Sequence, residues 1–128
     1  MSASGRKPLI WVGSTRKDLQ AFPARVQREV GYALHIAQIG GRHPDTKILK
    51  GFGGGAVLEV VQDYDGDTFR AVYTVRLAGR VYALHVFQKK SKSGISTPKK
   101  EMDRIRQRLQ EATEIHKDWL EENQAGGR

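Results

Sequence analysis

The chain has 128 residues, enough for one folded domain with a modest core. It contains no cysteine, which excludes disulfides and thiolate metal sites, and its formal net charge is +8 at pH 7. No apolar run approaches the roughly 18 residues of a membrane span, so we expect a cytoplasmic protein that does not enter a membrane. We expect a single domain over 8–122, with disordered segments at 1–7 and 123–128.

The positive charge is concentrated in particular segments. Residues 89–108 hold eight Lys or Arg and two Asp or Glu, whereas residues 109–128 hold two Lys or Arg and five Asp or Glu. Such clustering favours a polyanionic partner, and RNA or DNA is the commonest one. The simpler alternative is that the positive charge only keeps a small protein soluble. In the last predicted helix the cations precede the acids, which opposes the helix dipole and favours a purpose other than stability, such as binding a polyanion. The alternative is that exposed helix charges are screened and cost little.

The first half of the chain predicts one strand and two helices. Apolar β-formers predict a strand at 8–12, and a short helix follows over 15–22. Apolar residues spaced three and four apart predict a second helix over 23–39. Residues 42–55 are expected to form a loop. Its glycines do not make a phosphate loop, because no Gly-Lys-Ser/Thr is present and a strand comes next.

The second half predicts three strands and a long helix. A strand at 57–62 is followed by an Asp-Gly turn over 63–67, whose aspartates lack the glutamate of a calcium loop. Alternating side chains predict a hairpin over 68–90. Its second arm, 81–88, is apolar on both faces, as expected of a covered central strand. The last helix is expected to start at Thr97, which caps it.

This order, β-α-α-β-β-β-α, predicts an α+β fold. We expect a four-stranded, mostly antiparallel sheet with the two N-terminal helices on one face, and a C-terminal helix. The hairpin places Arg70 in the middle of one strand and Lys89 and Lys90 just after the end of the next. These cations are therefore expected to lie close together, at the sheet face opposite the two helices.

Four segments, GSTRKDLQAFP, LKGFGGG, GDTFRAVYTV and VFQKKSKSGISTPK, resemble the RelE/ParE toxin superfamily and, within it, the phage-derived, HigB-like branch. The similarity spans about residues 8–115. It implies the RelE-like fold and the toxin of a type II toxin–antitoxin pair. Active RelE-like members enter the ribosomal A site and cut mRNA without a metal or other cofactor, leaving a 2′,3′-cyclic phosphate. The resemblance also implies a cognate antitoxin, often a helix-turn-helix DNA binder.

The resemblance assigns roles to particular residues. Arg70 matches the mid-strand arginine of the family, which implies that it stabilises the phosphate. Lys89 and Lys90 match the basic pair after the last strand, and they hold the phosphate or transfer a proton. His85 is a candidate proton shuttle, although its parity with Val81, Ala83 and Phe87 favours a packed core histidine. The candidate RNA-binding cations, for which solvated surface is the alternative, are Lys50, Arg76, Lys92, Lys99, Lys100 and Arg104.

The sequence also departs from RelE. Glu59 and its neighbours stand where RelE has basic residues, and the catalytic tyrosine near the C-terminus of RelE has no clear counterpart. Glu59 is therefore a candidate base, or the ion-pair partner of an arginine on a neighbouring strand. Two other classes stay open: a ParE-like protein that poisons DNA gyrase without catalysis, and a basic nucleic-acid-binding module without activity.

Overall fold

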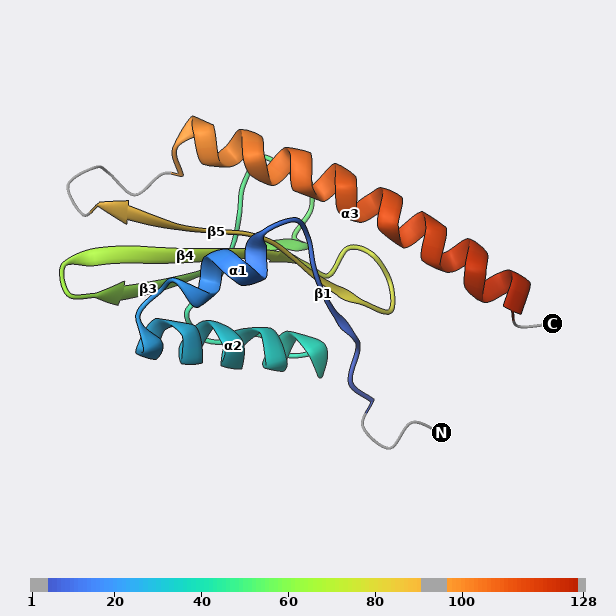
Figure 1. The fold of residues 1–128 in the computed structure, drawn as a ribbon, viewed down its shortest axis with the longest axis horizontal. Helices are drawn as coiled ribbons and strands as arrows, with labels where there is room; N and C mark the ends of the chain where they lie inside the picture. The colour runs from blue at the N-terminus through green and yellow to red at the C-terminus, as the bar shows by residue number, and fades with distance from the viewer. Residues whose placement is uncertain (1–4, 91–96, 127–128) are drawn as a thin grey trace.

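A computed structural model describes residues 5–90 and 97–126. Its elements in chain order are β1 (Leu9–Trp11), α1 (Thr15–Gln20), α2 (Ala24–Gln38), β2 (Thr46–Ile48), β3 (Val57–Tyr64), β4 (Asp67–Thr74), β5 (Val81–Lys90) and α3 (Lys99–Gly126). The sheet lies between two helical layers, with α2 on one face and α3 on the other (Figure 1). The predicted α+β class is confirmed. None of these helices is both long and apolar enough to cross a membrane.

The sheet has five strands in the order β1-β5-β4-β3-β2, not the four that we predicted. Strand β1 runs parallel to β5, and the other neighbours are antiparallel. The additional strand is β2, at residues predicted to be a loop. Three residues at a sheet edge are too few to show a period-2 pattern, so no local pattern predicts this strand.

The predicted hairpins are confirmed. Strands β3 and β4 are joined at Asp65-Gly66, where both residues have positive φ, 54° and 85°. That is the geometry that an Asp-Gly turn between two strands provides. Strands β4 and β5 pair antiparallel and carry Arg70 and Lys89 of the candidate site.

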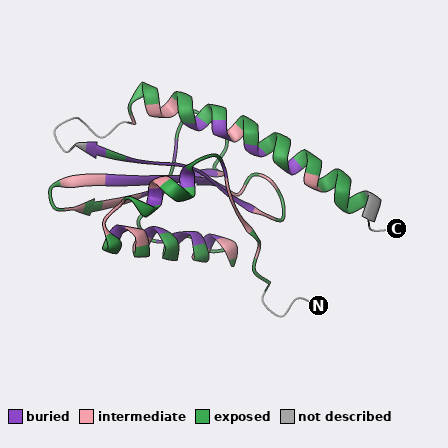
Figure 2. Cartoon of the chain, viewed as in Figure 1, coloured by how far each residue is buried: buried purple, intermediate pink, exposed green. Residues whose placement is uncertain are grey.

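Two apolar clusters hold the layers together. On one face, Val30 and Leu34 of α2 pack with Val60 and Phe69 of the sheet. On the other face, Ile105 of α3 belongs to the second apolar cluster, which lies between α3 and the sheet. Figure 2 shows the buried residues along the central strands and the inner sides of the helices, with exposed residues outside. The end of α3 extends past the sheet, so only its first part covers the site (Figure 1).

A β-bulge in β5 changes the predicted face of His85. The Cα partners run from Val72↔His85 to Tyr73↔Ala83 and skip Leu84. Because one extra residue shifts the alternation by one, the side chains before and after the bulge change faces. His85 therefore lies on the α3 face, and not on the face of Ala83 as strict alternation had predicted.

Arg108 of α3 satisfies the backbone at this bulge. Its Nη1 donates to the carbonyl oxygens of Leu84 (3.0 Å) and Val12 (3.2 Å) and to Thr15 Oγ1 (2.9 Å). A Cβ at Gly13, where φ is 58°, would lie 2.7 Å from Arg108 Cζ, so this close approach requires glycine. Arg108 is therefore a structural cation that fixes α3 on the sheet. It is not part of the exposed basic cluster that the charge pattern had indicated.

Candidate functional site

Charged side chains from four strands meet on the α3 face of the sheet. Lys47 of β2 is the Cα partner of Glu59 on β3. On the neighbouring strands Arg70 is opposite Phe87, two residues from Lys89. Cross-strand partners and residues two apart share a face. The strand register therefore gathers one carboxylate and three cations at one place.

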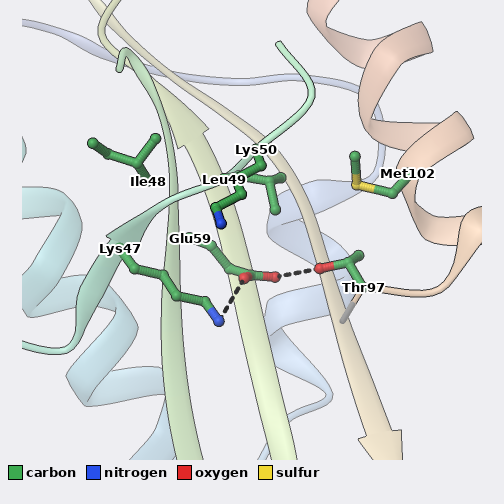
Figure 3. Close-up of a pocket in the computed structure, with 7 residues that line it drawn as sticks. All are labelled: Lys47, Ile48, Leu49, Lys50, Glu59, Thr97 and Met102. Atoms are coloured by element: carbon green, nitrogen blue, oxygen red, sulfur yellow. Dashed lines mark hydrogen bonds and ion pairs between the residues drawn. The ribbon is translucent and has the colours of Figure 1, made fainter. Parts of the chain in front are cut away.

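The carboxylate of Glu59 is the centre of this group. Its side chain is fully buried, and Oε1 accepts a hydrogen bond from Arg70 Nη1 at 3.1 Å. Thr97 Oγ1 donates to Oε2 at 3.2 Å, and Lys47 Nζ lies 3.8 Å from Oε1 (Figure 3). A buried carboxylate is tolerated only when such partners compensate its lost hydration. Glu59 thus forms an ion pair with an arginine of a neighbouring strand. This was the predicted alternative to a role as a general base.

Arg70 and Lys89 lie close together, as the hairpin had predicted, but both are buried. Their exposed fractions are 5% and 7%. Burial lowers the pKa of Lys89 below its usual value, and the neighbouring guanidinium of Arg70 lowers it further, while Glu59 acts in the opposite direction. An amine in this setting gives up its proton more readily than an exposed lysine does.

Lys89 and Lys90 belong to the sheet itself. Strand β5 continues to Lys90, with Thr68 opposite Lys89, so the chain does not leave the sheet after Gln88 as we had expected. The strand holds the backbone of Lys89 in a fixed register, which a loop would not do. The side chain of Lys90, and the whole of Lys92, lie outside the described part of the chain.

His85 connects the sheet to the start of α3. Its Nε2 lies 2.7 Å from Glu101 Oε1, and its ring stacks on Phe87 with centroids 5.4 Å apart. Burial lowers the pKa of His85, and the carboxylate of Glu101 opposes this decrease. The ring is buried and already has a partner. These contacts fit a histidine that holds β5 and α3 together.

A pocket of about 480 Å³ opens beside Glu59, between the β2 edge and the first turn of α3. Figure 3 shows Lys47 and Thr97 reaching the carboxylate from different elements, with Met102 contributed by the helix. The lining residues are Lys47, Ile48, Leu49, Lys50, Glu59, Thr97 and Met102. The charged group therefore adjoins a space that can hold a ligand.

The other predicted cations are on the surface. Lys50 is exposed and lines the pocket, and Lys100 and Arg104 are exposed on α3. Lys99 is also exposed and pairs with Asp103 one turn along the helix, at 2.9 Å. Arg76 lies after β4, and its guanidinium donates to the carbonyl oxygens of Phe52 and Gly53. Arg76 therefore holds the glycine-rich segment while it remains exposed.

Sequence reasoning missed Lys47 and Thr97. Lys47 carried no signal, because its strand was too short to be predicted. Thr97 was expected only to cap α3, whereas its hydroxyl donates to Glu59 across 38 positions of the chain. Both contacts depend on how distant segments meet, which no local pattern reports. Among residues 5–90 and 97–126, no group of three or more His, Asp or Glu side chains could hold a metal ion.

Residues 17–110 match the family described as phage derived protein Gp49-like (DUF891). The chain belongs to this family. A solved structure of the E. coli toxin RelE, a free-state mutant with two arginines changed to alanine, is similar to the Gp49-like chain with a TM-score of 0.51 and 16% identity. The match covers 68% of this chain and 85% of that one. No curated protein matches the chain.

These comparisons confirm the resemblance predicted from the sequence. The Gp49-like family is the phage-derived branch that the four segments indicated, and the fold is that of the RelE-like superfamily. At this identity the RelE match establishes the fold alone. What the site of the Gp49-like chain offers chemically is a carboxylate that can accept a proton, a fixed guanidinium, and an amine with a lowered pKa.

Proposed function

We propose that this protein is the toxin of a type II toxin–antitoxin pair, and that it cuts mRNA on the ribosome without a metal. The family and the fold support a toxin. The observation that carries the nuclease proposal is the group formed by Glu59, Arg70 and Lys89 on three adjacent strands. It brings together the three chemical functions that cleavage of a phosphodiester by its own 2′-hydroxyl needs.

In the proposed reaction the 2′-oxygen of a ribose attacks the adjacent phosphorus. Glu59 accepts the proton that the hydroxyl loses, and Arg70 stabilises the additional negative charge on the phosphate oxygens. Lys89 donates a proton to the 5′-oxygen as its bond to phosphorus breaks. The products are a 2′,3′-cyclic phosphate and a 5′-hydroxyl. Lys90 is a candidate second contact to the phosphate, and His85 positions β5 against α3.

Substrate binding must rearrange the buried group. Arg70 is 5% exposed, and one of its donors is used by Glu59. A guanidinium has five N–H donors, so it can contact a phosphate and a carboxylate together. We propose that the RNA phosphate replaces part of the present contacts of Arg70, which leaves Glu59 close to the reacting hydroxyl.

Partners follow from this function. The exposed cations Lys50, Arg76, Lys99, Lys100 and Arg104 are candidates for contacts with ribosomal or messenger RNA. A protein with this activity needs an antitoxin, which we expect to be a helix-turn-helix protein that covers the site. It acts in the cytoplasm, where ribosomes are.

The burial of Arg70 and Lys89 favours a second candidate. If these groups never reach a substrate, the exposed cations alone bind a nucleic acid or a nucleic-acid enzyme. The protein would then be a ParE-like inhibitor of DNA gyrase, or a binding module without activity. A gyrase inhibitor produces DNA damage with intact mRNA, and a binding module allows normal growth.

Expression of the toxin alone tests the proposal. We expect growth arrest and transcripts cut within the translated region. Arg70→Lys should relieve both, because an ammonium cannot reproduce the planar contacts of a guanidinium although it keeps the charge beside Glu59. Arg28→Ala, which removes an exposed arginine from α2, is the matched control and should leave the arrest unchanged. Arrest with intact transcripts would overturn the nuclease proposal.

A further inference from the structure

The pocket beside Glu59 has walls that phosphate chemistry does not need. Leu49 is 7% exposed and belongs to the apolar cluster under α3, and Met102 packs against that cluster. Both line the pocket. Phosphate is bound by cations and N–H donors, so an apolar wall adds nothing to its binding. A flat, partly apolar ligand gains from such a wall, and a methionine thioether adapts to its shape.

The volume also exceeds what a phosphate alone requires. At about 480 Å³ the pocket lies within the range of roughly 300–1,000 Å³ typical of small-molecule sites. Its lining residues come from the β2 edge, β3 and the start of α3. The volume fits one residue of a longer polymer.

The polar groups of the pocket are arranged beside its apolar wall. Lys47, with 52% of its side chain exposed, and the exposed Lys50 supply ammonium donors. The carboxylate of Glu59 is already held by Arg70 and Thr97. Lysine ammonium groups pair best with O6 and N7 of guanine, two acceptors on one edge of the base. The available donors therefore favour a base with adjacent acceptors.

We propose that this pocket takes one unpaired nucleobase of the RNA chain, with guanine preferred, next to the phosphate that Arg70 contacts. The proposal rests on the proposed function for the identity of the polymer. Proteins that recognise single-stranded RNA place splayed-out bases against side chains and bind their edges with polar groups. In this protein Met102 and Leu49 pack on the base, and Lys47 and Lys50 bind its edge.

Nucleotide titration of the full chain tests this without any cleavage assay. The probes are 5′-GMP, AMP, CMP and UMP, and inorganic phosphate, followed by the NMR signals of the Met102 methyl group and the Leu49 and Lys50 amides. We expect GMP to shift these signals and to bind most tightly. Met102→Ala and Lys50→Ala should each weaken GMP binding about tenfold, the order of magnitude of one lost base contact.

Two control variants separate the pocket from general effects. Leu109→Ala removes a partly buried apolar side chain one heptad further along α3, outside the pocket, and Lys17→Ala removes an exposed lysine of α1. Both should leave GMP binding unchanged. If phosphate shifts the same signals as GMP, or if Met102→Ala binds all four nucleotides as wild type does, the inference is overturned.

The cleavage pattern distinguishes this inference from the proposed function. If the toxin cuts mRNA, the wild type should cut beside guanine, and Met102→Ala should lose that preference. Cutting with a preference that survives Met102→Ala overturns the nucleobase pocket alone. Base-selective binding by a protein that cuts no transcript overturns the nuclease and leaves the pocket in place.

Discussion

Arg70 and Arg108 are equally buried, each at 5% exposure, and both lie between the sheet and α3. Their partners differ. Arg70 contacts the carboxylate of Glu59 at 3.1 Å, beside a pocket. The hydrogen bonds of Arg108 go to carbonyl oxygens and to hydroxyl groups at the β5 bulge. One guanidinium faces a group that can gain a proton, and the other faces groups that cannot.

The difference separates a structural cation from a candidate functional one. Carbonyl oxygens at a bulge need donors, so Arg108 completes the backbone hydrogen bonding of the fold. A buried ion pair contributes little net stability, because the cost of desolvating both charges offsets their attraction. The Arg70–Glu59 pair therefore has no clear advantage for stability over apolar side chains of similar volume, which supports a use in chemistry.

Glu59→Gln should produce the largest change. The amide keeps an oxygen that accepts from Arg70 but can no longer take up a proton, so we expect ribosome-dependent cleavage to slow by about 10²–10⁴-fold. Because Arg70 loses its counter-charge, stability also falls, and the rate must be measured per folded molecule by circular dichroism and single-turnover cleavage. A wild-type cleavage rate in this variant would mean that Glu59, like Arg108, has only a structural role.

Arg108→Met should have the opposite profile. It leaves the carbonyl groups of Leu84 and Val12 without this donor, which we expect to cost about 3 kcal/mol in the free energy of unfolding and to lower Tm by about 10 °C. Thermal and urea unfolding measure this effect. Cleavage per folded molecule should stay within about twofold of wild type, since general acid–base and electrostatic groups are untouched. If Arg108→Met slowed cleavage per folded molecule as much as Glu59→Gln does, the two arginines could not be assigned different roles.

The histidines between β5 and α3 extend the comparison to pH. His116 is 6% exposed, its Nδ1 lies 2.8 Å from the Tyr82 hydroxyl, and burial and Arg80 both lower its pKa. The unfolded chain then binds more protons than the folded one, so stability is complete above about pH 6.5 and decreases as pH falls.

Urea unfolding at pH 7.5 and pH 5.5 measures this dependence. His116→Gln and His85→Gln should each reduce it, because burial lowers the pKa of both histidines in the folded protein. A pH dependence that survives both substitutions would mean that neither histidine is its source.

The exposed lysines of α3 should give the smallest change. Lys99→Ala with Lys100→Ala removes two surface cations, so RNA affinity should fall several-fold. The slope of log affinity against log salt should become shallower by about 1.4 for two lost phosphate contacts on a single strand. Arg108→Met should leave this slope unchanged, because its guanidinium is buried. An unchanged slope in the lysine variant would place the RNA surface elsewhere.

Local patterns were sufficient for much of the fold. The apolar spacing of α2, the alternation in β4 and the Asp65-Gly66 turn each predict structure from neighbouring residues alone, and the structure contains all three. Because β4 and β5 are joined by a short connection, even the proximity of Arg70 and Lys89 could be inferred from the sequence. Strand β2 was missed because three edge residues carry no periodic signal.

The sequence by itself determined the order of the helices and of every strand except β2, the central hairpin, and the proximity of Arg70 and Lys89, because these depend on the preferences of residues close together in the chain. Only the tertiary structure decided that Glu59 meets Arg70 and Thr97, that the bulge at Leu84 turns His85 toward α3, and that Arg108 is buried. Each of these depends on strand register or on the docking of α3. Register and docking are set by the packing of whole faces, so a residue's neighbours in the sequence do not report them.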